Sequence, residues 1–378
     1  MKTTEEQTKT RLIADLAPIL RGILAEPRDS EDDPYLRAVL KWAGTSDVTN
    51  ADSALLCLDA PTQNAPVEET RGRFRQAVEA HRGQHGKSPR AVLVSNVGSF
   101  TVERELVAPE QPLQNKVALV TGAAGAIGAG ICRELLKRGG RVAASDIARK
   151  ALDELVADLG QAARERIIGV VMDVTDEASV ADGFDAVVCA WGGVDIVVAN
   201  AGLAHVASLM EMDLEMFRKL EKVNIEGTLL TLAEAGRRLR LQGTGGDIIL
   251  ISTKNVFAPG AQFGAYSATK AAAHQLARIA SLELAPYGIR VNMVAPDAVF
   301  SDGKRKSGLW AEVGPSRMKA RGLDEEGLEE YYRSRNLLKA RVTAGHVANA
   351  VLFFATRQTP TTGATIPVDG GLPDATPR

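Results

Sequence analysis

The sequence contains few cysteines and no long apolar segment. Its three cysteines, Cys57, Cys132 and Cys189, are scattered and have neither metal-site spacing nor the even number typical of a disulfide framework. We therefore expect reduced, buried thiols and a cytoplasmic protein. The first residues, MKTTEEQTKT, lack the apolar core of a signal peptide, and no uninterrupted apolar run is long enough to cross a bilayer.

An excess of charge of either sign is also absent. The formal net charge is -2, which gives no reason to expect nucleic acid or an anionic membrane as a partner. Hydrophobic residues make up 45% of the chain and charged residues 24%, a balance typical of globular proteins with a large core. The length of 378 residues favours two domains or slightly more.

A glycine-rich turn lies between an apolar run and a helical pattern. The segment KVALVTGAAGAIG, which starts at Lys116, predicts a buried strand and a turn, and the predicted helix continues through Ile131 to Arg138. Glycines let a backbone approach a pyrophosphate closely, and a helix amino terminus offers it free N–H groups. The alternative is a tight strand-to-helix connection. The candidate cofactor residues in this turn are Gly122, Gly125, Ala126, Ile127 and Gly128.

The next predicted strand, RVAASD, ends in an acidic residue, Asp146. A carboxylate at this position accepts a hydrogen bond from the adenosine ribose of NAD, so the pattern favours NAD. Arg149 and Lys150 follow closely and offer partners for a 2′-phosphate, which leaves NADP as the less favoured alternative. A helix cap is the other interpretation of Asp146, and it would carry no information about the cofactor.

Three side chains suited to hydride-transfer chemistry lie within DIILISTKNVFAPGAQFGAYSATK. Tyr266 and Lys270 are four residues apart on a predicted Ala-rich helix, so they share one face. A neighbouring ammonium favours the phenolate, and we expect Lys270 to lower the pKa of Tyr266. Thr253 follows the apolar run from Ile248 to Ile251, a predicted strand whose end can meet this helix. The pattern predicts an oxidoreductase.

These motifs resemble the short-chain dehydrogenase/reductase family, whose active site contains a Ser, a Tyr-x-x-x-Lys pair and an upstream Asn. The resemblance covers about Leu113 to Arg378 and implies catalytic roles for Thr253, Tyr266, Lys270 and Asn224. It implies an α/β fold with a doubly wound, Rossmann-type parallel sheet, here with a smaller amino-terminal α/β domain. The further cofactor contacts that it implies are Ile147, Asp173, Val174, Asn200, Ala201, Gly202, Pro296, Val299 and Ser301.

The sequence departs from the family pattern at three positions. Ala126 stands where most members of this length have Gly, a spacing that also fits an epimerase-like branch. Thr253 keeps the hydroxyl of the usual Ser and adds a methyl group. Asp297 replaces the usual Gly after Pro296, and we expect it either to bind a substrate hydroxyl, together with Asn255, or to cap a loop.

A narrower resemblance is visible in Thr-Lys-Asn, Pro-Asp-Ala-Val-Phe, Gly-Leu-Trp (308–310) and Tyr-Tyr-Arg-Ser-Arg-Asn-Leu-Leu (331–338). These segments look like the dehydrogenase half of bifunctional rhamnulose-1-phosphate aldolase/short-chain dehydrogenases, which is thought to act on lactaldehyde or related sugar-derived compounds. The resemblance implies an NAD-dependent enzyme acting on a sugar, polyol, hydroxyaldehyde or phosphorylated relative. It also implies a homodimer or homotetramer. The alternatives are a non-catalytic dinucleotide-binding regulator and an epimerase or dehydratase that retains its cofactor.

The sequence before Leu113 predicts a separate segment, residues 1–112, that ends in the linker APEQP. Its patterns predict helices over Gln7–Leu24, Pro34–Trp42 and Glu68–His81 and strands over Ala54–Leu58 and Ala91–Val94. LRGILA and PRAVLVSNVGSF resemble a class II aldolase, and we interpret the segment as a shortened, inactive remnant. We expect it to pack on the dehydrogenase domain, shape its oligomer or cover its entrance. His81 and His85 have the spacing of a metal pair, but without a third histidine nearby we expect a solvated helix end and no metal site.

A basic stretch lies between Ser301 and Val342, where the family forms its substrate lid. The basic residues are Lys304, Arg305, Lys306, Arg317, Lys319 and Arg321. A solvated surface is the favoured interpretation. The functional alternative is recognition of a phosphate or carboxylate, to which arginine offers a two-pronged fork.

Overall fold

The computed structural model describes residues 4–44, 55–62, 65–163, 165–303 and 305–374. Its largest element is a parallel sheet of seven strands in the order β15-β12-β11-β10-β7-β8-β9. The strands are β7 Val117–Thr121, β8 Arg141–Asp146, β9 Ile167–Val171, β10 Ile196–Ala199, β11 Gly246–Ile251, β12 Ile289–Pro296 and β15 Thr365–Val368. The strand order reverses between β7 and β10, and a Rossmann-type sheet binds its ligand at the carboxyl ends of the strands beside such a point.

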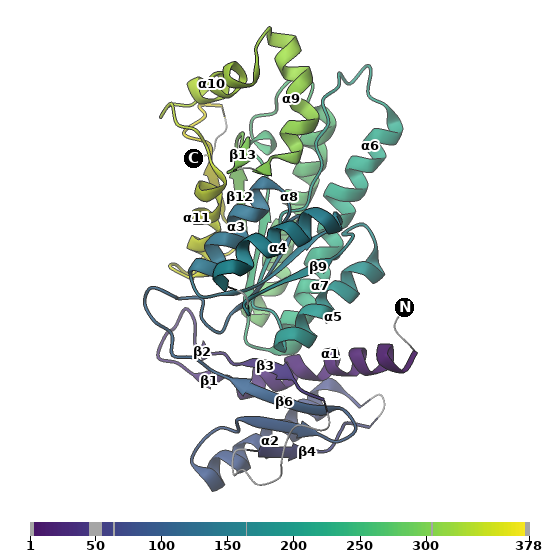
Figure 1. The fold of residues 1–378 in the computed structure, drawn as a ribbon, viewed down its shortest axis with the longest axis vertical. Helices are drawn as coiled ribbons and strands as arrows, with labels where there is room; N and C mark the ends of the chain where they lie inside the picture. The colour runs from purple at the N-terminus through teal and green to yellow at the C-terminus, as the bar shows by residue number, and fades with distance from the viewer. Residues whose placement is uncertain (1–3, 45–54, 63–64, 164, 304, 375–378) are drawn as a thin grey trace.

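Helices cover both faces of this sheet (Figure 1). One face packs against α3 Ala126–Lys137, α4 Arg149–Ala163 and α11 Ala344–Ala355. The other packs against α5 Glu177–Trp191, α7 Gly227–Gln242 and α8 Gly264–Leu284. The strands are buried on both faces, and their sequences are therefore almost continuously apolar, as is usual for parallel sheets. The fold confirms the predicted doubly wound α/β class.

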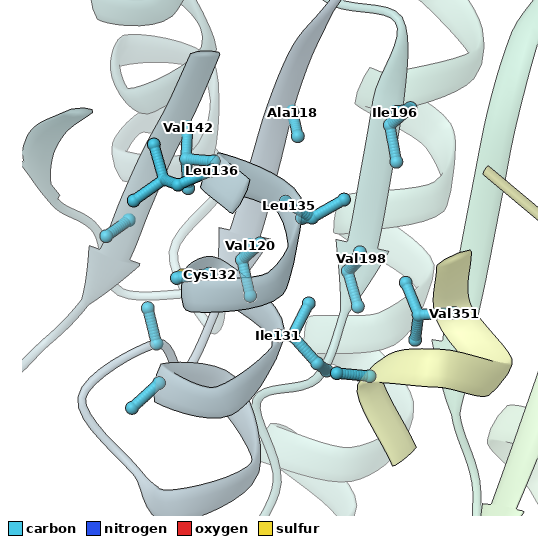
Figure 2. Close-up of a cluster of buried hydrophobic side chains, with 14 of the residues drawn as sticks. Ala118, Val120, Ile131, Cys132, Leu135, Leu136, Val142, Ile196, Val198 and Val351 are labelled. Carbon is cyan, nitrogen blue, oxygen red and sulfur yellow. The ribbon is translucent and has the colours of Figure 1, made fainter. Parts of the chain in front are cut away.

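The first core forms where α3 and α11 meet over the sheet (Figure 2). Ile131 and Leu135 of α3 pack on Val120 and Val198, which pair in register on β7 and β10. The two helices approach closely because position 130 is glycine: a Cβ there would lie 2.6 Å from the Cβ of Ala344. This packing fixes α3 against the sheet and so fixes the glycine-rich turn at its amino end.

The amino-terminal segment contains its own four-stranded sheet, in the order β3-β6-β5-β4, with two helices. Its elements are α1 Thr4–Leu24, β1 Glu26–Pro27, β2 Tyr35–Leu36, β3 Val39–Trp42, β4 Leu55–Leu58, α2 Val67–His85, β5 Ala91–Val94 and β6 Gly98–Glu103. The predicted helices over 7–24 and 68–81 and the strand over 91–94 are confirmed. The strand predicted over 54–58 is confirmed from Leu55, because Ala54 lies outside the described residues.

The helix predicted over Pro34–Trp42 is wrong. These residues form β2 and β3, and β3 pairs with β6 from Val39 opposite Glu103 to Trp42 opposite Phe100. The pairing joins residues far apart in the sequence, so a local pattern does not contain it. β6 itself was not predicted.

The amino-terminal segment packs under the amino ends of the large sheet, and α1 lies against α5 and α7 (Figure 1). Gly22 of α1 makes this approach possible, since a Cβ there would collide with the backbone carbonyl of Gln242. The expectation that the segment packs on the dehydrogenase part is confirmed. The alternative that it covers the entrance is wrong, because the carboxyl ends of the strands lie at the opposite edge.

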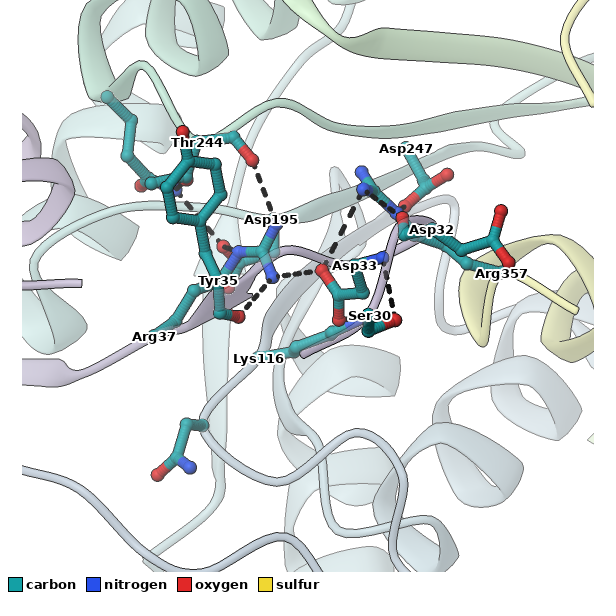
Figure 3. Close-up of polar contacts among 12 residues, drawn as sticks. Ser30, Asp32, Asp33, Tyr35, Arg37, Lys116, Asp195, Thr244, Asp247 and Arg357 are labelled. Atoms are coloured by element: carbon teal, nitrogen blue, oxygen red, sulfur yellow. Dashed lines mark hydrogen bonds and ion pairs between the residues drawn. The ribbon is translucent and has the colours of Figure 1, made fainter. Parts of the chain in front are cut away.

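A buried cluster of charges joins the segment to the sheet (Figure 3). The Arg21 guanidinium donates to both carboxylate oxygens of Asp195, at 3.0 and 2.7 Å, immediately before β10. Asp33 forms ion pairs with Arg37 at 2.6 Å and with Lys116 at 2.8 Å, immediately before β7. These partners hold the pKa of both carboxyl groups below the usual range in spite of their burial.

The cysteines form no disulfide, but their burial differs from the expectation: Cys132 is buried, Cys189 is half-buried and Cys57 is exposed on the edge strand β4. Among the described helices, none is both long and apolar enough to span a membrane. His81 and His85 have ring centroids 4.5 Å apart, and His81 is buried, so the expected solvated helix end is wrong for that residue. In the described part of the chain, no group of three or more potential metal ligands comes together.

Candidate active site

The candidate site lies at the carboxyl ends of β7, β10, β11 and β12. The turn after β7 has a positive φ of 61° at Gly122, where a Cβ would lie 2.8 Å from the Cα of Ala201. A Cβ at Gly128 would collide with the carbonyl oxygen of Gly122. Glycine at these two positions therefore permits a tight backbone cradle that any larger residue would break.

The amino end of α3 opens from this cradle. Gly125 is its extended N-cap residue, and the helix begins at Ala126 without a side-chain cap. The first N–H groups of a helix have no partner within the helix, and no capping side chain satisfies them here. The chain therefore offers Ala126, Ile127 and Gly128 as backbone donors at a positive helix end, which suits a pyrophosphate.

Asp146 ends β8 beside the glycine-rich turn. One carboxylate oxygen accepts from the backbone N–H of Ala124 at 3.0 Å, and the other accepts from that of Ala148 at 3.0 Å. Asp146 thus fixes the glycine-rich turn and also holds the residue before α4, which begins at Arg149, so its contacts are those of a local turn and not of a helix cap. Ile147 follows with a side chain that is exposed.

Asn200 links the two strands on either side of the point where the strand order reverses. Its side-chain amide donates to the carbonyls of Thr121 and Gly122, both at 2.9 Å. Ala201 follows and donates its backbone N–H to the Thr121 hydroxyl. The Asn-Ala-Gly segment therefore holds the floor of the cradle.

Two further predicted cofactor contacts, Asp173 and Val174, lie in the loop after β9. The Asp173 carboxylate accepts from the backbone N–H and the hydroxyl of Thr175, at 2.9 and 2.8 Å. Val174 is buried and packs against Gly227, where a Cβ would lie 2.8 Å from a Val174 methyl group. These contacts fix the loop after β9 at the same edge of the sheet.

Tyr266 and Lys270 lie on α8 as predicted, and both are buried. Thr253 follows the end of β11, and its hydroxyl lies close enough to Tyr266 to affect its pKa, so the predicted meeting of strand end and helix is observed. Burial raises the pKa of Tyr266 to about 12, and the Thr253 hydrogen bond opposes this only in part. Among the groups of the protein, burial and Thr253 set the pKa of Tyr266, and the expectation that Lys270 lowers it is wrong.

The Lys270 ammonium is directed to the backbone, because its Nζ donates to the carbonyl of Ile251 at 2.7 Å. Burial lowers the pKa of Lys270 to about 8. A Cβ at Gly202 would lie 3.4 Å from this Nζ and 3.2 Å from the Asn224 side-chain oxygen. Gly202 thus leaves room where Lys270 and Asn224 converge.

Asn224 lies in a π-helical turn, Lys222–Glu226, between α6 Leu214–Glu221 and α7. Its amide exchanges two hydrogen bonds with the backbone of Leu203, each at 2.9 Å, and donates to the Thr269 hydroxyl at 3.0 Å. π-helical turns occur often at functional sites because they displace one side chain from the regular helix surface. Here the turn places Asn224 beside Lys270.

The segment after β12 leads into the lid. Pro296 pairs with Val368 of β15, and Val299 is buried. Ser301 is exposed and begins a small hairpin of β13 Ser301–Asp302 and β14 Arg305–Lys306. Asp297 is bound by Arg335 at 2.7 Å. This ion pair joins the segment to α10 Glu325–Arg335 of the lid.

The short chain dehydrogenase family profile matches residues 116–312, which include the cradle, Asn224, Tyr266 and Lys270. This chain belongs to that family. An uncharacterized oxidoreductase of Bacillus subtilis, YuxG, is 37% identical over 72% of the chain, and the match spans 40% of that relative's length. The L-rhamnose 1-dehydrogenase (NAD(P)(+)) of Azotobacter vinelandii is 32% identical over 69% of the chain and 97% of the relative. The structure of sorbitol-6-phosphate 2-dehydrogenase from Erwinia amylovora matches with a TM-score of 0.62 and 30% identity, over 67% of this chain and 98% of that one.

Short-chain dehydrogenases bind a nicotinamide dinucleotide, and this chain is an enzyme acting on CH–OH groups. Sequence reasoning missed a second buried pair in the dehydrogenase, in which the Ser252 hydroxyl lies 2.9 Å from Nδ1 of His274. His274 lies one turn beyond Lys270 on α8, so the helical spacing was the available signal. It also missed Arg335, since the pairing of this lid residue with Asp297 depends on the tertiary fold.

Asn255 is buried in the short helix Lys254–Val256, and its backbone N–H donates to the Thr253 hydroxyl at 3.3 Å. This contact orients Thr253 toward Tyr266. Asn255 therefore lies beside Thr253, whereas the Asp297 carboxylate is held by Arg335 of the lid.

Proposed function

We propose that this dehydrogenase uses NAD to interconvert a hydroxyl and a carbonyl on a sugar, polyol, hydroxyaldehyde or phosphorylated relative. The observation that carries the proposal is that Tyr266 and Lys270 lie buried on one helix, with the Thr253 hydroxyl beside Tyr266. The substrate class is supported by relatives named as L-rhamnose 1-dehydrogenase, sorbitol dehydrogenase and D-threitol dehydrogenase.

The cradle fits a dinucleotide. Glycine at 122 and 128 keeps the turn tight, and α3 presents uncapped N–H groups toward it. We assign the pyrophosphate to the turn, the adenosine ribose to Asp146, the adenine side to Ile147, Asp173 and Val174, and the nicotinamide side to Asn200, Ala201, Gly202, Pro296, Val299 and Ser301. The bound nicotinamide supplies the hydride acceptor for oxidation and the hydride donor for reduction.

The chain's own groups handle the proton. Tyr266 accepts the hydroxyl proton in oxidation and donates one to the carbonyl oxygen in reduction. Thr253 holds the same oxygen and fixes its distance from Tyr266. We assign Lys270 to the nicotinamide ribose, and Asn224 to a proton path that ends at solvent, because its side-chain oxygen lies beside Lys270.

A panel of substrates tests this proposal. Reduction of NAD, with NADP alongside, would be followed with neutral sugars, polyols and hydroxyaldehydes and with their phosphates. We expect turnover with at least one member and a preference for NAD. Cofactor binding without turnover on any member, in either direction, would contradict the enzyme and favour a dinucleotide-binding regulator.

The rate of oxidation should depend on pH. Because burial raises the pKa of Tyr266 to about 12, the residue is protonated at neutral pH, which suits reduction and leaves little phenolate for oxidation. We expect kcat/KM for oxidation to rise by up to about tenfold per pH unit from pH 6 to 7, where Lys270 with its pKa of about 8 keeps most of its charge, and to rise less steeply as Lys270 loses its proton near pH 8. Initial rates in both directions would check this, and an oxidation rate that falls with rising pH would contradict it.

The cofactor preference should depend on Asp146. We expect Asp146→Asn to lower the ratio of kcat/KM for NAD to that for NADP by about tenfold or more, because a charged acceptor is lost and a 2′-phosphate is no longer repelled. Glu154→Gln on α4 is the matched control, since its side chain is exposed. An unchanged ratio in Asp146→Asn would show that Asp146 does not select the cofactor and serves only to hold the turn through its contacts with Ala124 and Ala148.

We further propose that residues 1–112 form a separate domain from 113–378 and that the chain assembles as a homodimer or homotetramer. Exposed apolar side chains on α7 and α8, at Leu229, Ile279 and Leu282, support assembly. The proposed origin of residues 1–112 as an inactive remnant of an aldolase domain rests on the sequence resemblance alone. Zinc-dependent cleavage of a sugar phosphate by this chain would show that residues 1–112 are not an inactive aldolase remnant.

A further inference from the structure

Arg317, on the lid helix α9 Gly308–Arg321, is a buried cation without an acidic partner in the described part of the chain. The residue is only 7% exposed. Its guanidinium lies over the Phe263 ring, 4.2 Å from the centroid, and donates a long hydrogen bond of 3.3 Å to the carbonyl of Ala261. Its Nε has no hydrogen-bond partner. Burying a charge without an opposite charge costs free energy. The Arg317 guanidinium is therefore suited to bind an anion from outside the chain.

The position of Arg317 connects it with the reacting groups. The Phe263 and Tyr266 ring centroids are 6.0 Å apart, and both rings belong to one apolar cluster that includes Val313 of α9. In Figure 1, α9 lies beyond the carboxyl ends of the strands, on the side of the sheet opposite α1. The Phe263 ring thus lies between Tyr266 and the Arg317 guanidinium, which places Arg317 within reach of the far end of a molecule that reacts at Tyr266.

The surroundings of Arg317 are also positively charged. Burial is the main cause that lowers the pKa of Arg317. The charges of Arg321 and Arg335 lower this pKa further, whereas Tyr331 and Tyr332 oppose the shift. The aromatic rings hold these cations in place: Arg321 lies over Tyr331 at 4.7 Å and Arg335 over Tyr332 at 4.3 Å.

Lys254 adds another cation directly after Thr253 in the chain, and its Nζ donates to the carbonyl of Ala258 at 3.1 Å. Burial lowers its pKa, and the charges of Arg335 and Arg317 lower it further, while Asp297 and Asp374 raise it. Asp297 is already ion-paired with Arg335 at 2.7 Å. The cations of this region thus outnumber the carboxylates that act on them.

The remaining basic residues of the lid do not share this environment. Arg305 lies 3.9 Å from Asp158, and Lys306 pairs with Glu325 at 2.8 Å. Lys319 is exposed on α9, and Lys304 lies outside the described residues. The solvated-surface interpretation therefore suits Lys306 and Lys319, but it is wrong for Arg317.

We propose that Arg317, assisted by Lys254, binds an anionic group at the non-reacting end of the substrate, either a phosphoryl group or a carboxylate. This inference rests on the proposed function, because it assigns the substrate class of the same site. A planar guanidinium suits both groups, since it donates two parallel hydrogen bonds to a pair of oxygens. The substrate then carries its hydroxyl or carbonyl at Tyr266 and its charge under α9.

Anion binding is tested first, without turnover. Titration calorimetry with inorganic phosphate and with acetate, each in the presence of saturating NAD, would compare the wild type with Arg317→Met, Arg317→Lys and Lys319→Met. We expect Arg317→Met to weaken binding of at least one anion about ten- to a hundredfold, the effect of losing hydrogen bonds to a charged group. Arg317→Lys should retain part of the binding, and the exposed control Lys319→Met all of it.

The thermal midpoint separates this role from a structural one. Methionine removes the buried charge and retains much of the side-chain length, so Arg317→Met should unfold at the wild-type temperature or above it. A fall of the midpoint together with unchanged anion binding would show that Arg317 only supports the lid, and would overturn the inference.

Turnover supplies the second measurement. For matched pairs of substrates, one neutral and one anionic, we expect the loss of kcat/KM in Arg317→Met to be at least about tenfold larger on the anionic member. In the binding titrations, phosphate binding that depends on Arg317 identifies a phosphoryl group as the anionic end of the substrate. Acetate binding that depends on Arg317 identifies a carboxylate. Equal losses on both members of a pair would overturn the inference. Binding that depends on Arg317 without any turnover would instead sustain the anion site and reject the proposed reaction.

Discussion

Tyr266→Phe is expected to lower kcat by about 10²- to 10⁴-fold, because it removes the only proposed proton donor and acceptor at the reacting oxygen. The phenyl ring keeps the contact with Phe263 and its place in the apolar cluster under α9. The fold and the cofactor cradle should therefore be unaffected. Single-turnover rates with NAD and the best substrate would give the change in the chemical step.

Tyr287→Phe is the matched control, since Tyr287 is 42% exposed and lies beyond the end of α8. Its kcat should equal that of the wild type. NAD binding, measured by fluorescence titration, should be the same in both variants. Turnover of Tyr266→Phe within about threefold of the wild type would remove Tyr266 from the proton-transfer step.

Arg21→Met is expected to destabilise the protein by about 3–5 kcal/mol, because it leaves a buried carboxylate short of its main partner. Arg21 is 1% exposed and makes two hydrogen bonds to Asp195. Asp195 retains the Arg37 ion pair at 3.0 Å and the backbone N–H of Val117 at 2.7 Å, which do not replace the lost guanidinium. Urea unfolding monitored by circular dichroism would measure the change.

Arg11→Met on the same helix is the control, since Arg11 is exposed, and we expect a change within about 0.5 kcal/mol. The double variant Arg21→Met/Asp195→Asn should recover part of the loss, because it removes the unpaired charge. An Arg21→Met protein as stable as Arg11→Met would show that the amino-terminal segment is held by its apolar contacts alone.

The same cluster predicts a loss of stability in acid. Folding lowers the pKa of Asp33 and Asp195 from the ordinary value of 3.8, so both carboxylates stabilise the folded state above that pH. Their contribution falls as the pH drops below about 4, where the unfolded chain binds protons that the folded chain excludes.

The large sheet and the main site residues could be predicted because their signals are local. A buried strand, a glycine-rich turn and a helix follow one another from Lys116, and Tyr266 and Lys270 share a helix face by their spacing alone. The order of these motifs along the chain was enough to predict the family and the parallel sheet. The pKa of Tyr266 was not predictable, since it depends on burial, which the sequence does not state.

The doubly wound sheet, the glycine-rich cradle and the candidate reacting side chains could thus be predicted from local patterns, because periodicity and glycine placement act over a few residues. The tertiary structure was needed to show that 39–42 pairs as a strand with β6, that the amino-terminal segment lies at the edge opposite the candidate site, and that Arg317 is buried with no acidic partner among the described residues. Each of these features depends on contacts between residues distant in the chain. Such contacts are set by which surfaces can pack and which charges can pair once the whole chain has folded.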